Sequence, residues 1–371
     1  MRVLCSAPVA PARGFSAALF LLVATALGLR VSAAQAQPGE DEDRSEIIAV
    51  VGEQYVRGYA TGLVEASSAA LGSGLFFESG QAGDLIGPIN LYVGVRAAAI
   101  PFGDGARTFN LNRRSAGQIR LPDGTLREAK YTYRVEDAPT ALGEHQSGPE
   151  VRVATRYRDA NGDMTTEEFR FKAPQGLLGY LPVVPSGVPQ AGLGVPALGL
   201  RVSARYMPPL SYRNVPVRLR NAGVNTVEGA LWGVGARESL DAWFEALPFE
   251  LAIYGYYQQI GIATKGNLEQ EVLDFSMVSG GVNLSKPVLE EPTYSLSLFA
   301  AAGAETSTAH FTYRAAQEDT PFSSVIDFKI ENSLAFRTQA GFSTRFGPLM
   351  INLGYAPLPR NTILGGIGFS L

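Results

Sequence analysis

The last ten residues, TILGGIGFSL, alternate strictly between two unlike sets of side chains. One set is mostly apolar and comprises Ile363, Gly365, Ile367, Phe369 and Leu371. The other is tiny or polar apart from its first member and comprises Leu364, Gly366, Gly368 and Ser370. A period of two indicates a β-strand with two different faces. The last ten residues are therefore expected to form a strand with one apolar face and one face of mostly small or polar side chains.

The same alternation recurs in five other stretches, at 89–100, 197–207, 249–258, 334–346 and 349–355. In each, the second face mixes Arg, Glu, Gln, Tyr, Ser, Asn and Gly. A dry core does not suit such a face, whereas a wet lumen does, with the apolar face turned to lipid. Phe342 is accordingly expected to face lipid and Arg337 the lumen. A half-buried antiparallel sheet of a soluble protein stays open as an alternative.

A sheet that crosses a membrane must close, because no backbone group can be left unpaired in lipid. We therefore expect an all-β fold, a closed antiparallel transmembrane β-barrel with a short N-terminal amphipathic helix. Weaker alternation adds strands near 126–135, 150–158, 164–172, 224–237, 271–285 and 293–306. With the clear ones and the last, the expected number is twelve, within a range of ten to fourteen. The strands at 126–172 are so charged that we expect them to extend beyond the bilayer.

An even strand number places both termini in the periplasm. It makes 285–292 and 345–349 periplasmic turns, so that residue 288 is inside and residues 215 and 318 are outside. The outer loops are expected in the longer polar segments, near 104–124, 136–149, 208–222, 259–270 and 308–326. The segment 176–196 is rich in Pro and Gly, and because Pro cannot donate within a ladder, we expect a connection or a lumen constriction there rather than a strand.

Residues 1–36 have the charged start, apolar middle and small-residue AQA site of a secretory signal peptide. A transmembrane anchor is the rival interpretation. The expected division is 1–36 signal peptide, 37–84 periplasmic segment with a helix, and 85–371 outer-membrane barrel. Cys5, the only cysteine, lies in this leader. Removing its three arginines from the 31 basic residues leaves 28 against 35 acidic, which gives no reason to expect nucleic acid as a partner.

The helix is expected over 40–63, because Ile47, Val51, Tyr55, Tyr59 and Leu63 recur every fourth residue. This stripe must bury against something. A plug would set it against a charged wall, which leaves those charges poorly solvated. The periplasmic rim offers apolar partners, and we therefore expect a rim-packed helix that leaves the lumen partly open. The partners on the rim would be Leu240, Trp243, Phe244 and Leu247.

Several segments together resemble a family of uncharacterised outer-membrane barrels, domain of unknown function 6588. They include YATGLVEASSAALGSGLFFESGQ, VPALGLRVSARYMPP, ESLDAWFEALP and the ILGGIGFSL ending, in that order. The layout is also distantly similar to the long-chain fatty-acid transporter group. GIGFSL is similar to the C-terminal signal that the barrel-assembly machinery reads, with Leu371 in place of the usual Phe. The resemblance implies an outer-membrane location and a barrel, but no substrate.

The sequence offers little for catalysis. Its two histidines, His145 and His310, fall in expected loops. DANGD at 159–163 is interpreted as a hairpin turn rather than a calcium loop. We expect no enzyme activity, no cofactor, no metal site and no catalytic residue. An outer-membrane lipid-modifying enzyme is the least favoured alternative.

The residues predicted to line the lumen carry the functional hypothesis. They are Arg96, Arg201, Arg205, Glu250, Tyr254, Tyr256, Glu305, Arg337 and Arg345. Charged rings select solutes in pores, so we expect a porin-like barrel that passes or binds a small solute. The alternative is a structural or assembly protein whose lumen charges satisfy one another. The expected partners are outer-membrane lipid, the assembly machinery and an unknown solute.

Overall fold

The computed structural model describes residues 41–72, 89–120, 125–144, 149–159, 161–172, 176, 183–212, 224–240, 248–266, 270–314 and 325–370. These residues form one α-helix, α2 (Asp41–Gly72), two short 3-10 helices, η1 (Asp104–Ala106) and η2 (Pro196–Leu198), and fourteen strands in two sheets. The predicted signal peptide lies outside the described residues. No helix in the described part of the chain is both long and apolar enough to cross a bilayer.

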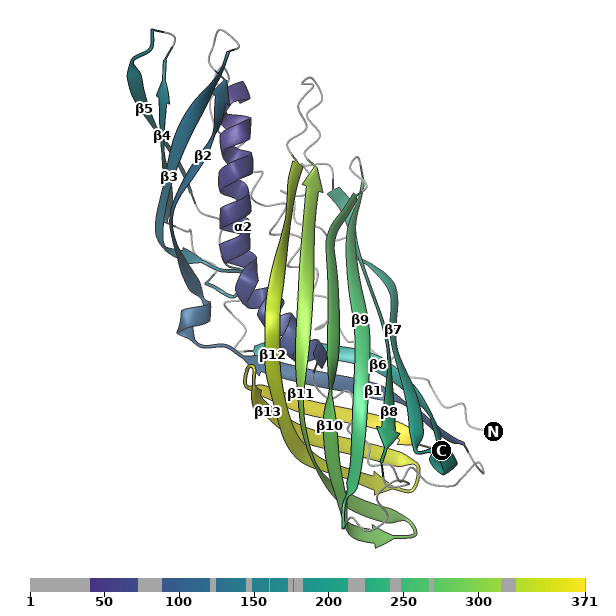
Figure 1. Ribbon diagram of the computed structural model, residues 1–371. Coiled ribbons are helices and arrows are strands. Elements are labelled where there is room, and N and C mark those ends of the chain that lie inside the picture. Colours follow the sequence, from purple (N-terminus) through teal and green to yellow (C-terminus); the bar gives the residue numbers. More distant parts are fainter. Residues whose placement is uncertain are drawn as a thin grey trace, which may run out of the picture.

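Ten antiparallel strands form a closed barrel in which β1 pairs with both β14 and β6 (Figure 1). The ring continues from β14 down through β13, β12, β11, β10, β9, β8 and β7 back to β6. The strands are β1 (Asn90–Pro101), β6 (Val183–Val195), β7 (Leu200–Tyr212), β8 (Val224–Ser239), β9 (Glu250–Gly266), β10 (Gln270–Glu291), β11 (Tyr294–Arg314), β12 (Val325–Phe346), β13 (Leu349–Leu358) and β14 (Thr362–Ser370).

The other four strands form a separate sheet, which we call the insert because the chain makes it between β1 and β6. They are β2 (Thr108–Arg120), β3 (Leu126–Pro139), β4 (Glu150–Arg158) and β5 (Met164–Lys172). The expected twelve barrel strands are therefore wrong, and the number is ten. Three of the twelve belong to the insert, whereas their charge predicted only that they extend beyond the bilayer. β2 falls in a segment that was expected to be a loop.

β6 is the barrel strand that the sequence interpretation rejected. It pairs with β1 over twelve residues without a register shift, straight through Pro185 and Pro189. Its pairing with β7 covers only six, from Gln190–Arg205 to Val195–Leu200. Within the described strands, residues 183–189 of β6 have no partner on the side toward β7, and residues 206–212 of β7 have none on the side toward β6. The prolines are tolerated because they lie where β6 has a free edge, and an edge needs no N–H donor.

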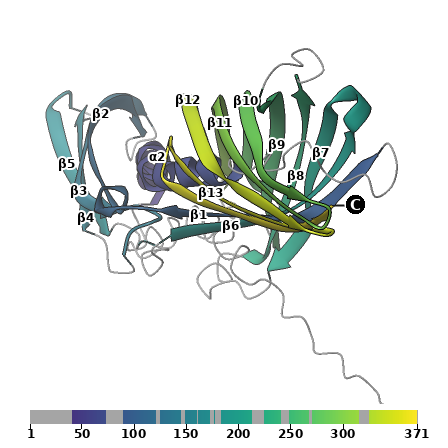
Figure 2. The same ribbon diagram turned by 90° about the horizontal axis from the view of Figure 1, so that it is seen from below.

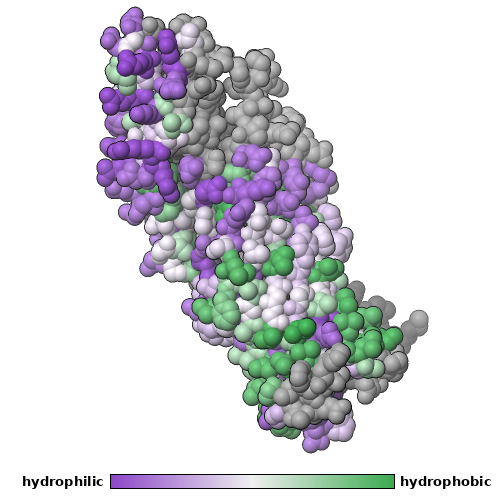
Figure 3. Space-filling view, in the orientation of Figure 1, coloured by the Kyte–Doolittle hydropathy of each residue, from purple (hydrophilic) through white to green (hydrophobic). Residues whose placement is uncertain are grey.

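The two faces of the barrel wall differ as predicted. Large apolar side chains point outward and are exposed, including Val95, Val202, Ile253, Phe336, Phe342 and Ile367. The inward face is largely polar towards the turn end of the strands, where Arg337 is 2% exposed, whereas Phe342 on the outward face of the same strand is 38% exposed. Further along the strands the inward face turns apolar, with Ile260, Phe311 and Phe328 buried. Apolar surface gathers over the lower barrel in Figure 3, and the insert above it is mostly hydrophilic. An apolar exterior around an interior that carries polar side chains is the arrangement of a membrane barrel.

Replacing Phe342 with Arg puts a charge on this apolar exterior. We expect Phe342→Arg to lower the free energy of unfolding by about 2–4 kcal/mol in lipid, if the site lies near the bilayer midplane. Ser343→Arg on the inward face is not a fair control, because Ser343 is buried. Phe342→Ala is the better one, with a smaller loss. Urea titrations of the protein refolded in vesicles would measure both, and equal losses would contradict a lipid-facing position.

The barrel has two unlike ends. Short connections join strands at the end that we call the turn end, at 196–199, 292–293 and 347–348, and β8 ends and β9 begins there as well. At the opposite end, the loop end, lie the insert, the connection 359–361, the last residues of β7, β9 and β11, and the first residues of β8, β10 and β12. Both the start of β1 and the end of β14 are at the turn end. Strand parity thus agrees with the prediction, and residue 288 lies near the turn end, whereas residues 215 and 318 lie outside the described residues.

Candidate functional site

The helix α2 reaches the barrel from the loop end, beside the insert (Figures 1 and 2). The ring of Tyr55 packs edge-to-face against that of Phe109 in β2, with ring centroids 5.1 Å apart. Arg57 Nη1 donates to the Lys329 carbonyl of β12 at 2.6 Å. Glu65 forms an ion pair with Arg360, in the connection between β13 and β14. Tyr55, Tyr59 and Leu63 of the predicted stripe are therefore buried between the insert and the mouth of the barrel.

The predicted packing of this helix at the periplasmic rim is wrong. Its contacts are at the loop end, which is the opposite end from Leu240. The other three expected partners, Trp243, Phe244 and Leu247, lie outside the described residues. The charged wall was the reason for excluding the lumen. However, the large stripe residues stay at the mouth, and only the final turns go deeper. In those turns Ala66, Ala69 and Ala70 are buried, and their small side chains suit a narrow barrel.

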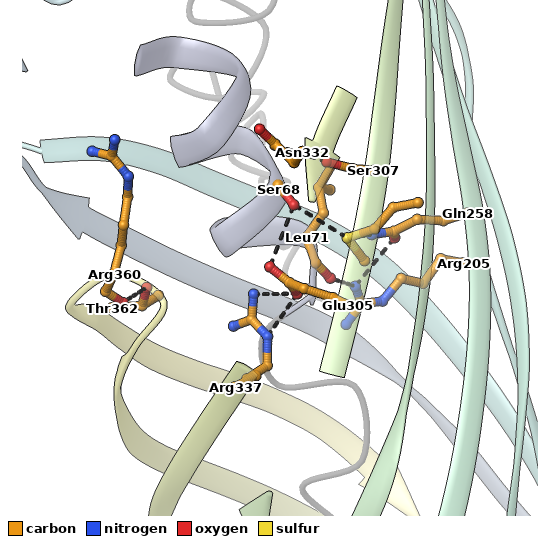
Figure 4. A network of polar contacts seen from close by, with 11 residues as sticks. Ser68, Leu71, Arg205, Gln258, Glu305, Ser307, Asn332, Arg337, Arg360 and Thr362 are labelled. Atoms are coloured by element: carbon orange, nitrogen blue, oxygen red, sulfur yellow. Dashed lines mark hydrogen bonds and ion pairs between the residues drawn. The ribbon is translucent and has the colours of Figure 1, made fainter. Parts of the chain in front are cut away.

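The last turn of α2 bridges the middle of the lumen (Figure 4). Arg205 Nη1 of β7 donates to the Leu71 carbonyl at 2.7 Å, which caps the C-terminus of the helix. Ser68 Oγ donates to Glu305 Oε1 of β11 at 3.4 Å and lies 3.8 Å from Met277 Sδ of β10. In a ring of ten, β7 and β12 are diametrically opposite. The helix end touches β7 on one side and the Glu305–Arg337 pair of β11 and β12 on the other.

Gly72 shows how close this approach is. A Cβ atom built on Gly72 would overlap Glu305 Oε2 and would lie 2.7 Å from Arg337 Nη2. Real Cβ atoms do not come so near, so any side chain at this position would displace the ion pair. This close approach could have been inferred from the sequence, because the run ASSAALG at 66–72 carries mostly small side chains and ends in glycine.

Two ion pairs lie on the inward wall, one beside the helix end and one near the turn end. Arg337 donates to Glu305 Oε2 through Nε at 2.7 Å and Nη2 at 2.5 Å, and both side chains are 3% exposed. Arg237 Nη2 donates to Glu250 Oε1 at 2.6 Å, and Ser285 Oγ donates to the other oxygen at 2.7 Å. Such pairs are stable only when their remaining hydrogen-bonding atoms are satisfied, so removing one partner is costly.

All nine residues of the predicted lumen set lie on the inward face of their strands. Arg96, Arg201, Arg205, Tyr256, Glu305 and Arg337 are buried, and Glu250, Tyr254 and Arg345 are partly buried. The structure joins Glu305 to Arg337 and places Arg205 against the helix. Glu250 forms its ion pair with Arg237, a residue that the sequence analysis did not single out. Arg237 follows Gly233 and Gly235 on the small face of a predicted strand, and that parity could have revealed it.

The inward wall has an excess of positive charge. Over the described barrel strands, six arginines and three glutamates face inward: Arg96, Arg201, Arg205, Arg237, Arg337, Arg345, Glu250, Glu290 and Glu305. Polar amides accompany them, and Gln190 accepts from Arg205 Nε at 3.0 Å. The inward wall of the described strands is therefore net positive.

The described residues contain no group of three or more side chains suited to hold a metal ion. His310 lies in β11, not in the predicted loop, and its Nε2 is 2.7 Å from Asp327 Oδ1 of β12. His145 lies outside the described residues. Asp159 Oδ1 accepts from the Asn161 and Asp163 amides, both at 2.9 Å, within the β4–β5 hairpin. The interpretation of DANGD as a turn is thus confirmed.

The fold and its surface define a class, a closed β-barrel of the outer-membrane type whose lumen is bridged by its own helix. The match to a family model gives the particular family: the model of the Family of unknown function (DUF6588) matches residues 15–371, and the chain belongs to it. The recognised resemblance to that family is confirmed. No curated protein matches.

Similarity to solved structures is weak. The β domain of the Bordetella autotransporter BrkA is 11% identical, with a TM-score of 0.31, over 76% of this chain and 100% of that one. The translocator domain of the autotransporter NalP from Neisseria meningitidis is 13% identical, with a TM-score of 0.26, over 88% and 96%. Similarities this low carry no argument about the present chain. The expected likeness to fatty-acid transporters has no support among them.

Proposed function

We propose that this protein is a non-enzymatic pore of the bacterial outer membrane that passes small anionic solutes and is closed at rest by α2. The observation that carries this proposal is the last helical turn, held between β7 on one side and β11 and β12 on the other. The helix enters from the loop end, which we place outside the cell. Outer-membrane lipid covers the apolar exterior. The assembly machinery reads the C-terminal strand β14.

The solute class follows from the wall. Six inward arginines against three inward glutamates give a positive path, and arginine binds carboxylates and phosphates through two parallel hydrogen bonds. Arg205 has a double role in this scheme. It holds the Leu71 carbonyl while the pore is closed, and it faces the path when the helix leaves.

Locking the helix tests the gate. Ser68 and Met277 are in contact, so Ser68→Cys with Met277→Cys can be joined by oxidation or by a short bis-methanethiosulfonate, which forms a reducible disulfide with each cysteine. In planar bilayers we expect rare open steps from the wild type at raised voltage, none from the joined variant, and their return after reduction or in Ser68→Cys alone. Steps that persist in the joined protein would show that ions bypass the helix.

The orientation needs a separate measurement. Asp104, in η1, is fully exposed at the loop end, and Thr293 is exposed in a turn at the other end. On intact cells, a membrane-impermeant maleimide should label Asp104→Cys and leave Thr293→Cys unlabelled until the outer membrane is opened. Labelling of Thr293→Cys but not Asp104→Cys on intact cells would mean that the barrel has the opposite orientation.

A structural or assembly role with a permanently filled lumen is the second candidate. The buried ion pairs and the helix cap favour it, because they satisfy the lumen charges internally. It predicts no open steps from the wild type under any voltage that the bilayer tolerates. A lipid-modifying enzyme has no observation in its favour.

A further inference from the structure

The insert has one buried face and one exposed face. On the buried face, Tyr131, Tyr133, Val151 and Val153 join the same core as the helix residue Tyr55. The other face points away from this core, and its positions alternate with the buried ones. We call this outward face the basic face, because arginine and lysine dominate it.

Cross-strand registers arrange the basic face in three rows. They run Asn112–Arg134–Arg152–Arg170, then Arg114–Thr132–Ala154–Glu168, then Ala116–Lys130–Arg156–Thr166. Three arginines therefore stand directly opposite one another on β3, β4 and β5, and Lys130 stands opposite Arg156. The rows hold six cations and one carboxylate. All six cations are exposed.

This arrangement works against the stability of the sheet. Like charges directly opposite on neighbouring strands are destabilising. Same-face carboxylates relieve one row: Arg134 pairs with Glu136 at 2.7 Å, and Arg170 pairs with Glu168 at 3.1 Å. These side chains are 46–69% exposed, and exposed pairs contribute little. Within the described residues, Arg114, Lys130 and Arg156 form no ion pair at all.

Folding therefore gives no reason for the basic face, and a ligand does. Short side chains, Thr132 and Ala154, separate the two main cationic rows, which lie four residues apart along the strands, or about 13 Å. One small anion cannot touch both rows. A chain that carries repeated negative groups can, and arginine binds carboxylate and phosphate oxygens in pairs.

We propose that the basic face binds an anionic polysaccharide. Single-stranded nucleic acid fits less well, because it needs exposed aromatic platforms, and the tyrosines of β3 are on the buried face. A bilayer surface fits less well too. The insert stands clear of the exposed apolar band of the barrel (Figures 1 and 3). A sugar polymer in solution around the loop end remains the occupant with the right charge and place.

Binding of alginate oligosaccharides to the full-length protein in detergent tests this proposal. Removing two charge-assisted contacts with Lys130→Ser and Arg156→Ser should weaken binding by about tenfold or more. The matched control is Lys286→Ser with Lys329→Ser, two exposed cations on the barrel, which should bind as the wild type does. The melting temperature of the first variant should stay unchanged or rise, because an opposed pair of like charges has gone.

Several outcomes would overturn the proposal. The wild type could fail to bind alginate at low salt, or bind uncharged dextran equally well. The control variant could lose as much affinity as the test variant. A clear preference for a single-stranded oligonucleotide or for anionic lipid vesicles over alginate would mean that the partner was assigned wrongly. If the double variant does not fold, Arg156→Ser alone is tested instead. It should change the logarithm of the Kd for alginate by about half as much as the double variant would.

Discussion

Deletion of residues 41–72 is expected to turn a closed barrel into one with large, stable open steps. The helix end contacts β7, β10 and β11, and its last carbonyl is capped by Arg205, so its removal frees the middle of the lumen. Single-channel recording in planar bilayers measures the change. Arg360→Ser, which removes only the Glu65 contact at the mouth, is the matched control and should open far less often.

The same recording tests the charge of the wall. In a KCl gradient, the reversal potential of the deletion variant should favour chloride, because inward arginines outnumber inward glutamates. Arg201→Ser and Arg237→Ser in the deletion background should each move it toward zero. A cation-selective opening would refute the proposed solute class while leaving the gate intact. Conductance that stays unchanged on deletion would refute the gate itself.

The second large effect is expected from the Glu305–Arg337 pair. Arg337→Met leaves a buried carboxylate without its cation, which should cost about 3–5 kcal/mol of unfolding free energy. Glu305→Leu should cost a similar amount for the reverse reason. The double variant should recover most of the loss, because an apolar pair needs no partner charge. Urea titrations of all four proteins in vesicles give the coupling energy directly.

Losses that simply add in the double variant would mean that the two side chains do not act as a pair. Ser285→Ala serves as the control, because it removes one neutral donor from the other pair and should cost only about 1 kcal/mol. The Glu305 variants should also open more readily in bilayers, since Ser68 donates to Glu305.

Alternation along single strands was enough to predict which side chains face inward. It worked because the period of two is set by backbone geometry, whatever the neighbouring strand. For the same reason it could not tell in which sheet a strand lies. The strands near 126–172 alternate as well as any barrel strand, and only their register with one another places them in the insert.

The two main errors have physical causes that lie outside local sequence. Pro185 and Pro189 argue correctly against a central strand, but β6 is central only from Gln190 onward, and its ladder with β7 is a long-range property. The helix was excluded from the lumen as one uniform element. Its stripe residues Tyr55, Tyr59 and Leu63 share one core with the insert and with apolar side chains of the barrel, and the alanine-rich end reaches the polar wall.

The contact between Glu65 and Arg360 also has a consequence for the order of folding. The two residues are 295 positions apart, and Arg360 belongs to the hairpin that brings the last strand to β1. Contacts this distant in sequence form late, because the entropy of closing the loop must be overcome first. The binding site of α2 is therefore incomplete until the β13–β14 hairpin has formed. We expect α2 to dock only after this hairpin is in place, and to stay undocked in a chain that is truncated before it.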